Sequence, residues 1–148
     1  MKHAALSIGA AIFAIAAASV DAHEPARGTT QGGVHLPETI TPLFKSDMPN
    51  VPGKALLAVE VSFPPGAASP SHTHPKSAFI YAYVLSGEIV SAVDDEKPRV
   101  YRVGESWHEP PGARHPVTRN ASKTEPARLL VIFVADPGEK QLVFPDPK

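Results

Sequence analysis

The stretch GAASPSHTHPKSAFIYAYVLSG (Gly66–Gly87) combines two closely spaced histidines with an apolar, aromatic segment. His72 and His74 lie in a proline-flanked, locally extended part of it. Side chains two positions apart point to the same side of an extended chain, so the two imidazoles face a common point. Imidazole binds several divalent metals and carries protons near neutral pH. The stretch therefore predicts a metal or catalytic site, which His115 could complete from a tight turn further along the chain.

The composition fits a globular protein and excludes several classes of site. Of the 148 residues, 43% are hydrophobic, which is enough to form a core. The 14 basic and 15 acidic residues are interspersed and give a net charge of −1, so the sequence does not predict nucleic-acid binding. Because there is no cysteine, disulfides, thiolate metal ligands and a cysteine nucleophile are excluded. Any metal site must use nitrogen and oxygen ligands.

The N-terminal residues predict an exported protein. A short positive start precedes the uncharged, alanine-rich run Ala4–Val20, and the small residues Val20 and Ala22 match the positions that a signal peptidase requires. We expect residues 1–22 to be a signal peptide cleaved after Ala22, which makes the mature chain periplasmic or secreted, with no membrane segment. The alternative is an uncleaved anchor, for which the run is short and weakly apolar.

The mature chain divides into a leader, a β domain and a tail. Residues 23–53 combine a polar, flexible leader with a proline-rich arm, whose prolines exclude a helix or a central strand. We expect this arm to lie on the domain surface, covering a sheet edge or a dimer partner. Residues 54–136 carry the strand patterns, and 137–148 form a proline-rich tail. The expected strands are Ala55–Phe63, Phe79–Leu85, Glu88–Val93, Arg99–Val103, Ser106–Glu109, Pro116–Arg119 and Arg128–Ala135.

Short strands separated by proline and glycine predict an all-β sandwich or barrel. Within this pattern, two blocks of sequence resemble the two motifs of the cupin family. The first block has Gly66, His72-Thr73-His74 and Gly87, and the second has Gly104, Pro110-Pro111-Gly112, His115 and Asn120. The resemblance covers Ala55–Asp136 and looks like a small, cupin type-2-like domain. It implies a jelly-roll barrel, the double-stranded β-helix, with a metal or ligand site inside.

One feature of the first block departs from the family pattern. Cupins usually carry a glutamate a few residues after the two histidines, but the window Pro75–Ile80 contains no carboxylate. One interpretation is a three-histidine site of His72, His74 and His115, completed by water or substrate. The other is a weak or lost metal site in a barrel that only binds a ligand.

The resemblance to three-histidine cupins implies a dioxygenase-like enzyme. Three neutral ligands would leave the charge of a divalent ion uncompensated, which favours an anionic small-molecule substrate. Imidazole suits iron, manganese, zinc, nickel and copper, so the sequence does not identify the metal.

Four further residues are candidates near the site. Glu109 could supply the missing carboxylate or orient a ligand imidazole, or it could be a surface charge. Tyr81 could donate a proton, or it could pack as an alternating strand aromatic. We expect Trp107 to form a cavity wall or a plug at the barrel rim, and Phe79 to line the pocket where the glutamate is missing. Glu109 and Tyr81 are therefore the candidate catalytic residues.

Two functions remain open from the sequence. One is an exported metal-dependent enzyme that acts on a small molecule. The alternative is a non-catalytic periplasmic cupin that binds or senses a small ligand or a metal, which the missing glutamate favours. In both cases we expect a homodimer, because small sheets have exposed edges and the proline-rich arm could pair with a partner.

Overall fold

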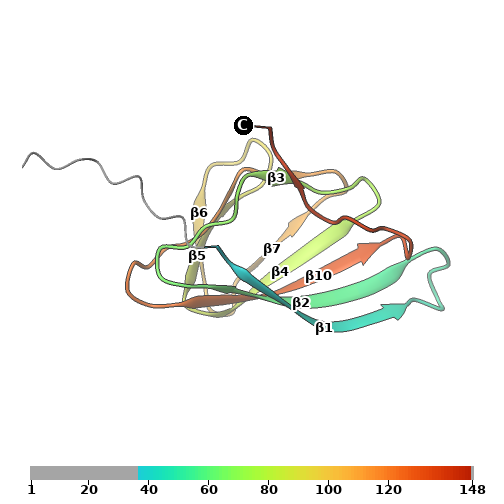
Figure 1. Ribbon diagram of the computed structural model, residues 1–148, viewed down its shortest axis with the longest axis horizontal. Coiled ribbons are helices and arrows are strands. Elements are labelled where there is room, and N and C mark those ends of the chain that lie inside the picture. The colour runs from blue at the N-terminus through green and yellow to red at the C-terminus, as the bar shows by residue number, and fades with distance from the viewer. Residues whose placement is uncertain (1–36, 148) are drawn as a thin grey trace, which may run out of the picture. The chain divides into compact units, whose positions relative to one another are not determined.

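The computed structural model describes residues 37–147, and every element in this range is a β-strand (Figure 1). The predicted signal peptide and leader, up to residue 36, lie outside the described residues. Within them, no helix is long and apolar enough to cross a membrane. The strands are β1 (Thr39–Asp47), β2 (Ala55–Phe63), β3 (His72–Thr73), β4 (Phe79–Ser86), β5 (Glu88–Ala92), β6 (Arg99–Arg102), β7 (Ser106–Glu109), β8 (Arg114–His115), β9 (Val117–Asn120), β10 (Ala127–Ala135) and β11 (Phe144–Pro145).

The largest sheet has five antiparallel strands in the order β1-β2-β10-β4-β7. Its middle strand, β10, alternates buried residues such as Val131 and Phe133 with half-buried ones such as Ile132. This alternation follows from the pleat, which sends successive side chains to opposite faces. The buried face belongs to the core, and the other face is also largely apolar.

Two smaller sheets, β11-β3-β8 and β6-β5-β9, complete the fold. Ile89 of β5 and Tyr101 of β6 belong to the same buried cluster as Ile80 of β4 and Leu129 of β10. The large sheet and the β6-β5-β9 sheet therefore enclose one core. These antiparallel sheets confirm the predicted all-β barrel of the jelly-roll type.

The proline-rich arm forms the edge strand of the large sheet. β1 pairs with β2 along Thr39–Asp47, so it covers the edge of β2. Covering a sheet edge was one of the two expectations for the arm. The pairing shifts register between Pro42 and Phe44. Proline cannot donate to a ladder, and it is tolerated at edges and bulges. The sheet therefore begins within the segment that the sequence predicted as a surface arm.

Two glycines of the motif blocks are required by local geometry. Gly87 has a φ of +71°, and a Cβ there would lie 2.7 Å from the carbonyl oxygen of Pro126. Gly112, with a φ of +79°, ends the Pro110-Pro111-Gly112 turn. The amide of Gly112 donates to the carbonyl of Pro75, and the amide of His74 donates to the carbonyl of Ala113. This turn therefore holds the loop that carries His74 beside β8.

Candidate metal centre

The three predicted histidines lie together and are buried. His72 of β3 is the direct cross-strand partner of His115 of β8, and His74 follows two positions after His72. The ring centroid of His72 lies 4.8 Å from that of His74 and 5.3 Å from that of His115. One nitrogen from each ring lies within 4.8 Å of the other two. The histidines meet because β3 and β8 are neighbours in one sheet, rather than facing each other across the barrel.

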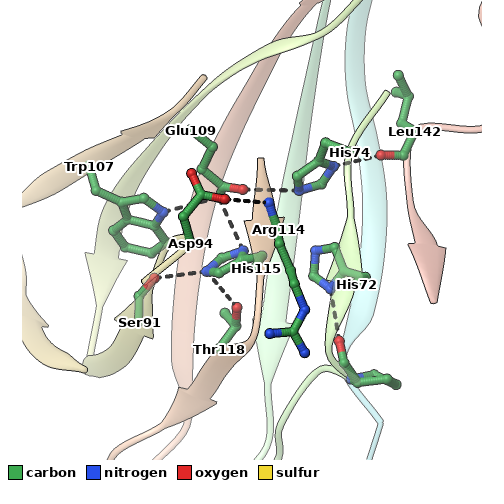
Figure 2. Close-up of polar contacts among 11 residues, drawn as sticks. His72, His74, Ser91, Asp94, Trp107, Glu109, Arg114, His115, Thr118 and Leu142 are labelled. Atoms are coloured by element: carbon green, nitrogen blue, oxygen red, sulfur yellow. Dashed lines mark hydrogen bonds and ion pairs between the residues drawn. The ribbon is translucent and has the colours of Figure 1, made fainter. Parts of the chain in front are cut away.

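Hydrogen bonds orient each ring from behind (Figure 2). Nδ1 of His72 donates to the carbonyl of Pro70 at 2.8 Å, and Nδ1 of His74 donates to the carbonyl of Leu142 at 2.6 Å. A carbonyl only accepts, so Nε2 of both neutral rings keeps a lone pair. Nε2 of His115 lies 2.8 Å from the hydroxyls of Ser91 and Thr118. When Nε2 donates to one of these hydroxyls, Nδ1 of His115 keeps its lone pair.

Glu109 of β7 lies between two of these histidines, as Figure 2 shows. Oε2 is 3.0 Å from Nε2 of His74, and Oε1 is 3.1 Å from Nδ1 of His115. Nε1 of Trp107 donates to Oε1 at 3.1 Å. Glu109 is only 2% exposed, so its interpretation as a surface charge is wrong. Oε2 is buried, and Nε2 of His74 donates to it when that ring is protonated.

The three histidines fit a divalent cation, and the Glu109 carboxylate lies beside two of them. The lone pairs of His74 and His115 lie about 3 Å from the carboxylate oxygens of Glu109. Two electron-rich atoms at this distance repel each other unless a proton or a metal ion lies between them. When His74 is neutral, Oε2 has no donor, and a buried carboxylate oxygen in that state is costly unless a cation lies beside it. Imidazole nitrogens with a carboxylate oxygen are a donor set that several divalent metals accept.

A cavity of about 290 Å³ adjoins the four side chains. Trp107 forms part of its wall, as the sequence predicted, and its ring lies 6.1 Å from that of His115. The facing wall comes from inward side chains of β2 and β10, which are Leu57, Val59, Val61, Leu129, Val131 and Phe133. The histidines and Glu109 therefore line a mainly apolar cavity.

A family model described as "Cupin domain" matches residues 59–133, which span the inner strands and all four of these residues. The chain belongs to the cupin family. No curated protein sequence matches it.

Several solved structures resemble this chain at 29–30% sequence identity. TT1209 from Thermus thermophilus is 30% identical over 68% of this chain and 85% of its own, with a TM-score of 0.55. An oxalate oxidase in complex with the substrate analogue glycolate is 29% identical over 68% of this chain and 53% of its own, with a TM-score of 0.54. The DMSP lyase DddQ from Ruegeria pomeroyi DSS-3 is 29% identical over 63% of this chain and 45% of its own, with a TM-score of 0.52. This cupin thus spans about half the length of each enzyme.

The protonation states of this cupin site suit metal binding. Burial lowers the pKa of His115 to about 4 and also lowers the pKa of His72, so both rings are neutral at pH 7. Burial also acts to lower the pKa of His74, but the adjacent Glu109 carboxylate outweighs this effect, so the pKa of His74 is raised. Burial alone would raise the pKa of Glu109, but His74 and His115 hold it below its usual value. The site therefore offers an ionised carboxylate, and His74 can hold a proton that a metal ion would replace.

Two sequence-predicted site residues lie outside the cavity. Tyr81 is 38% exposed and alternates with the inward-facing Ile80 and Ala82 on β4, so the sheet separates it from the histidines. Tyr81 therefore takes no part in the metal site proposed below. The prediction that Phe79 lines the pocket is wrong, because Phe79 is 42% exposed and stacks on His108 at 5.7 Å.

Sequence reasoning missed the groups that orient the rings. Ser91 is 2% exposed and Thr118 is 6% exposed. Both lie on expected strands, and a hydroxyl residue next to the hydrophobic residues of a strand was a usable signal in the sequence. Glu109 had a stronger signal, because it lies two positions after Trp107 on a strand and so shares its inward face. The carbonyls of Pro70 and Leu142 carry no signal, since the backbone is the same at every position.

Proposed function

We propose that this cupin binds a divalent metal ion through His72, His74, His115 and Glu109 and is a small-molecule enzyme of dioxygenase-like type. The observation that carries the proposal is the convergence of three buried imidazoles beside a buried carboxylate: one nitrogen of each ring lies within 4.8 Å of the other two, and Glu109 lies 3.0 Å from His74 and 3.1 Å from His115. Glu109 takes the place of the glutamate that is missing from the first motif block. The enzymes among the similar structures, an oxalate oxidase and a DMSP lyase, support enzymatic chemistry in such a barrel.

Each residue of the site has a part in this function. A bound divalent ion would act as a Lewis acid toward an oxygen donor of the substrate. The three imidazoles are held in place by hydrogen bonds from behind, which fixes the nitrogen that each presents. Glu109 offsets one of the two positive charges, so a substrate with one anionic oxygen donor makes the site neutral. Iron, manganese, zinc, nickel and copper all accept this donor set.

A second candidate function is a non-catalytic cupin that binds or senses a small ligand or a metal. This function is favoured by how few titratable side chains line the cavity. Among the described residues they are the four proposed ligands and Glu38. No separate acid or base pair is therefore positioned there. Oxygen uptake or product formation by the metal-loaded protein, in the presence of small chelating compounds, would decide for the enzyme.

The metal content of the purified mature chain tests the site itself. We expect about one divalent ion per chain in the wild type, measured by elemental analysis after removal of weakly bound metal. The double substitution His72→Ala/His74→Ala should abolish binding, and Glu109→Gln should weaken it by at least about tenfold. His108→Ala is the matched control, because His108 is exposed on the outer face next to Glu109. A wild type that binds no metal, or a Glu109→Gln variant that binds as tightly, would refute the proposal.

We also propose that the chain is exported, with cleavage after Ala22. This rests on the sequence of residues 1–22, which lie outside the described residues. Mass spectrometry of the mature protein from a periplasmic or culture-medium fraction, with His23 as the first residue, would support it.

A homodimer is the third part of the proposal, and the outer face of the large sheet supports it. The register places Phe44, Ala58, Ile132 and Tyr81 in one row across that face. Antiparallel sheets usually present polar side chains to water on one face, whereas both faces are apolar here. The nearby charges Glu60 and Arg128 pair with each other, so the face has no net charge that would repel a second copy.

A further inference from the structure

The cavity wall that faces the proposed metal site is hydrocarbon. Inward side chains form cross-strand pairs, Val61 with Leu129 and Val59 with Val131, and the pair Leu57–Phe133 brings the Phe133 ring to 5.8 Å from that of His74. The wall continues onto β1, where Ile40 faces Val61. Ile40 lines the cavity but is 53% exposed, so the cavity opens to solvent along β1.

The charges around the cavity are few and all acidic. Among residues 37–147, no lysine or arginine lines it, and the only charged side chains besides the histidines are Glu38 and Glu109. Glu38 is close enough to His72 for its charge to act on that ring. A ligand anchored at the histidines would therefore find no positive partner for a second anionic group, and burying an unpaired charge against hydrocarbon is strongly unfavourable.

We propose that this cavity selects a mainly hydrocarbon small molecule that carries a single chelating oxygen group at one end and no second charge. The inference rests on the proposed metal site, which would hold the oxygen group beside Glu109. The apolar body then packs on the wall of β2 and β10 and reaches toward Ile40. The volume of about 290 Å³ lies at the lower end for ligand pockets, which fits a small molecule rather than a large one.

A series of alkyl hydroxamates tests this selectivity, because the members share one monoanionic chelating group and differ only in chain length. Binding of aceto-, butyro- and hexanohydroxamate to the zinc-loaded mature protein is measured by calorimetry. We expect the Kd to fall about threefold for each added methylene while the chain is buried. Adipic acid monohydroxamate, which has a terminal carboxylate, should bind at least about tenfold more weakly than hexanohydroxamate.

A substitution at the mouth of the cavity gives an independent readout. Ile40→Lys introduces a positive charge at an exposed position, so it should not impair folding. We expect it to weaken hexanohydroxamate binding and to strengthen binding of the terminal carboxylate by up to about fivefold, with acetohydroxamate unchanged. Thr41→Lys is the matched control, because Thr41 pairs with Glu60 on the opposite face of β1 and should change none of these affinities.

The outcomes separate this inference from the proposed function. A rise in affinity with chain length supports the hydrocarbon ligand. So does a preference for hexanohydroxamate over adipic acid monohydroxamate that Ile40→Lys narrows and Thr41→Lys leaves unchanged. Acetohydroxamate binding that needs zinc but does not improve with chain length would overturn the inference and leave the metal site standing. The inference is also overturned if adipic acid monohydroxamate binds the wild type as tightly as hexanohydroxamate does. Failure of every hydroxamate and of zinc itself would refute the metal site.

Discussion

Ser91 and Thr118 each place a hydroxyl 2.8 Å from Nε2 of His115, and both are buried. One N–H needs only one acceptor, so either hydroxyl can replace the other. We therefore expect Ser91→Ala and Thr118→Val to have small effects singly. The double variant should leave a buried N–H without a partner, at a cost of about 1–3 kcal/mol in the free energy of unfolding. Urea unfolding of the wild type, the two single variants and the double variant measures the coupling between the two hydroxyls. Effects of the single substitutions that simply add up in the double variant would contradict the shared role.

At the scale of residues, the sequence predicted the ligands better than their surroundings. The spacing of His72 and His74, and the turn before His115, predicted the cluster because strands and turns impose fixed side-chain directions. Tyr81 was misplaced because β4 is apolar on both faces, so alternation could not show which face is inward. Glu109 stayed ambiguous because burial of a carboxylate depends on the partners around it, and two of these, His74 and His115, come from other parts of the chain.

At the scale of elements, a C-terminal clamp (residues 142–146) holds the strands that carry the histidines. The carbonyl of Leu142 accepts a hydrogen bond from His74, and β11 pairs with β3. Oδ2 of Asp146 accepts hydrogen bonds from Oγ of Ser71 at 2.6 Å and from Nε of Arg114 at 2.7 Å. Ser71 precedes β3 and Arg114 starts β8. The sequence predicted only a proline-rich tail here, because the contacts that anchor it are single hydrogen bonds without a sequence pattern.

The clamp gives a prediction for pH. The hydrogen bond from Ser71 and the pairing with Arg114 lower the pKa of Asp146 from its ordinary value of 3.8. The folded pKa lies below the unfolded one, so this contribution to stability is present above pH 3.8 and is lost as the pH falls through the lowered pKa. With chelator present, we expect Asp146→Asn to be less stable than the wild type at neutral pH, with the difference shrinking in acid. A difference that stays constant down to the lowest pH would contradict this role.

At the scale of the whole molecule, the apolar outer face of the large sheet predicts an assembly. We expect the mature protein to sediment as a dimer, because Phe44, Ala58, Ile132 and Tyr81 form an apolar row that a second copy can cover. Ile132→Glu should shift it to a monomer and leave the metal content unchanged, since this side chain faces away from the cavity. Analytical ultracentrifugation measures both proteins. A wild type that is monomeric at micromolar concentration would contradict the prediction.

The sequence predicted the barrel itself well, because cupin motif blocks and strand patterns span Ala55–Asp136. It did not predict β1 as a strand of the sheet. Four prolines in residues 34–53 weaken the strand pattern, and only the edge position, with its bulge at Pro42, makes pairing possible. Tertiary context of this kind is absent from local sequence.

X-ray absorption spectroscopy of the zinc-loaded mature protein tests the central claim most directly, because it reports the atoms bound to the ion. The account predicts nitrogen and oxygen ligands at about 2.0–2.2 Å. It also predicts the outer-shell scattering of three imidazoles, lost in His72→Ala/His74→Ala, and a changed oxygen contribution in Glu109→Gln. A spectrum without imidazole scattering, or one that Glu109→Gln leaves unchanged, would contradict a site built from three histidines and this glutamate.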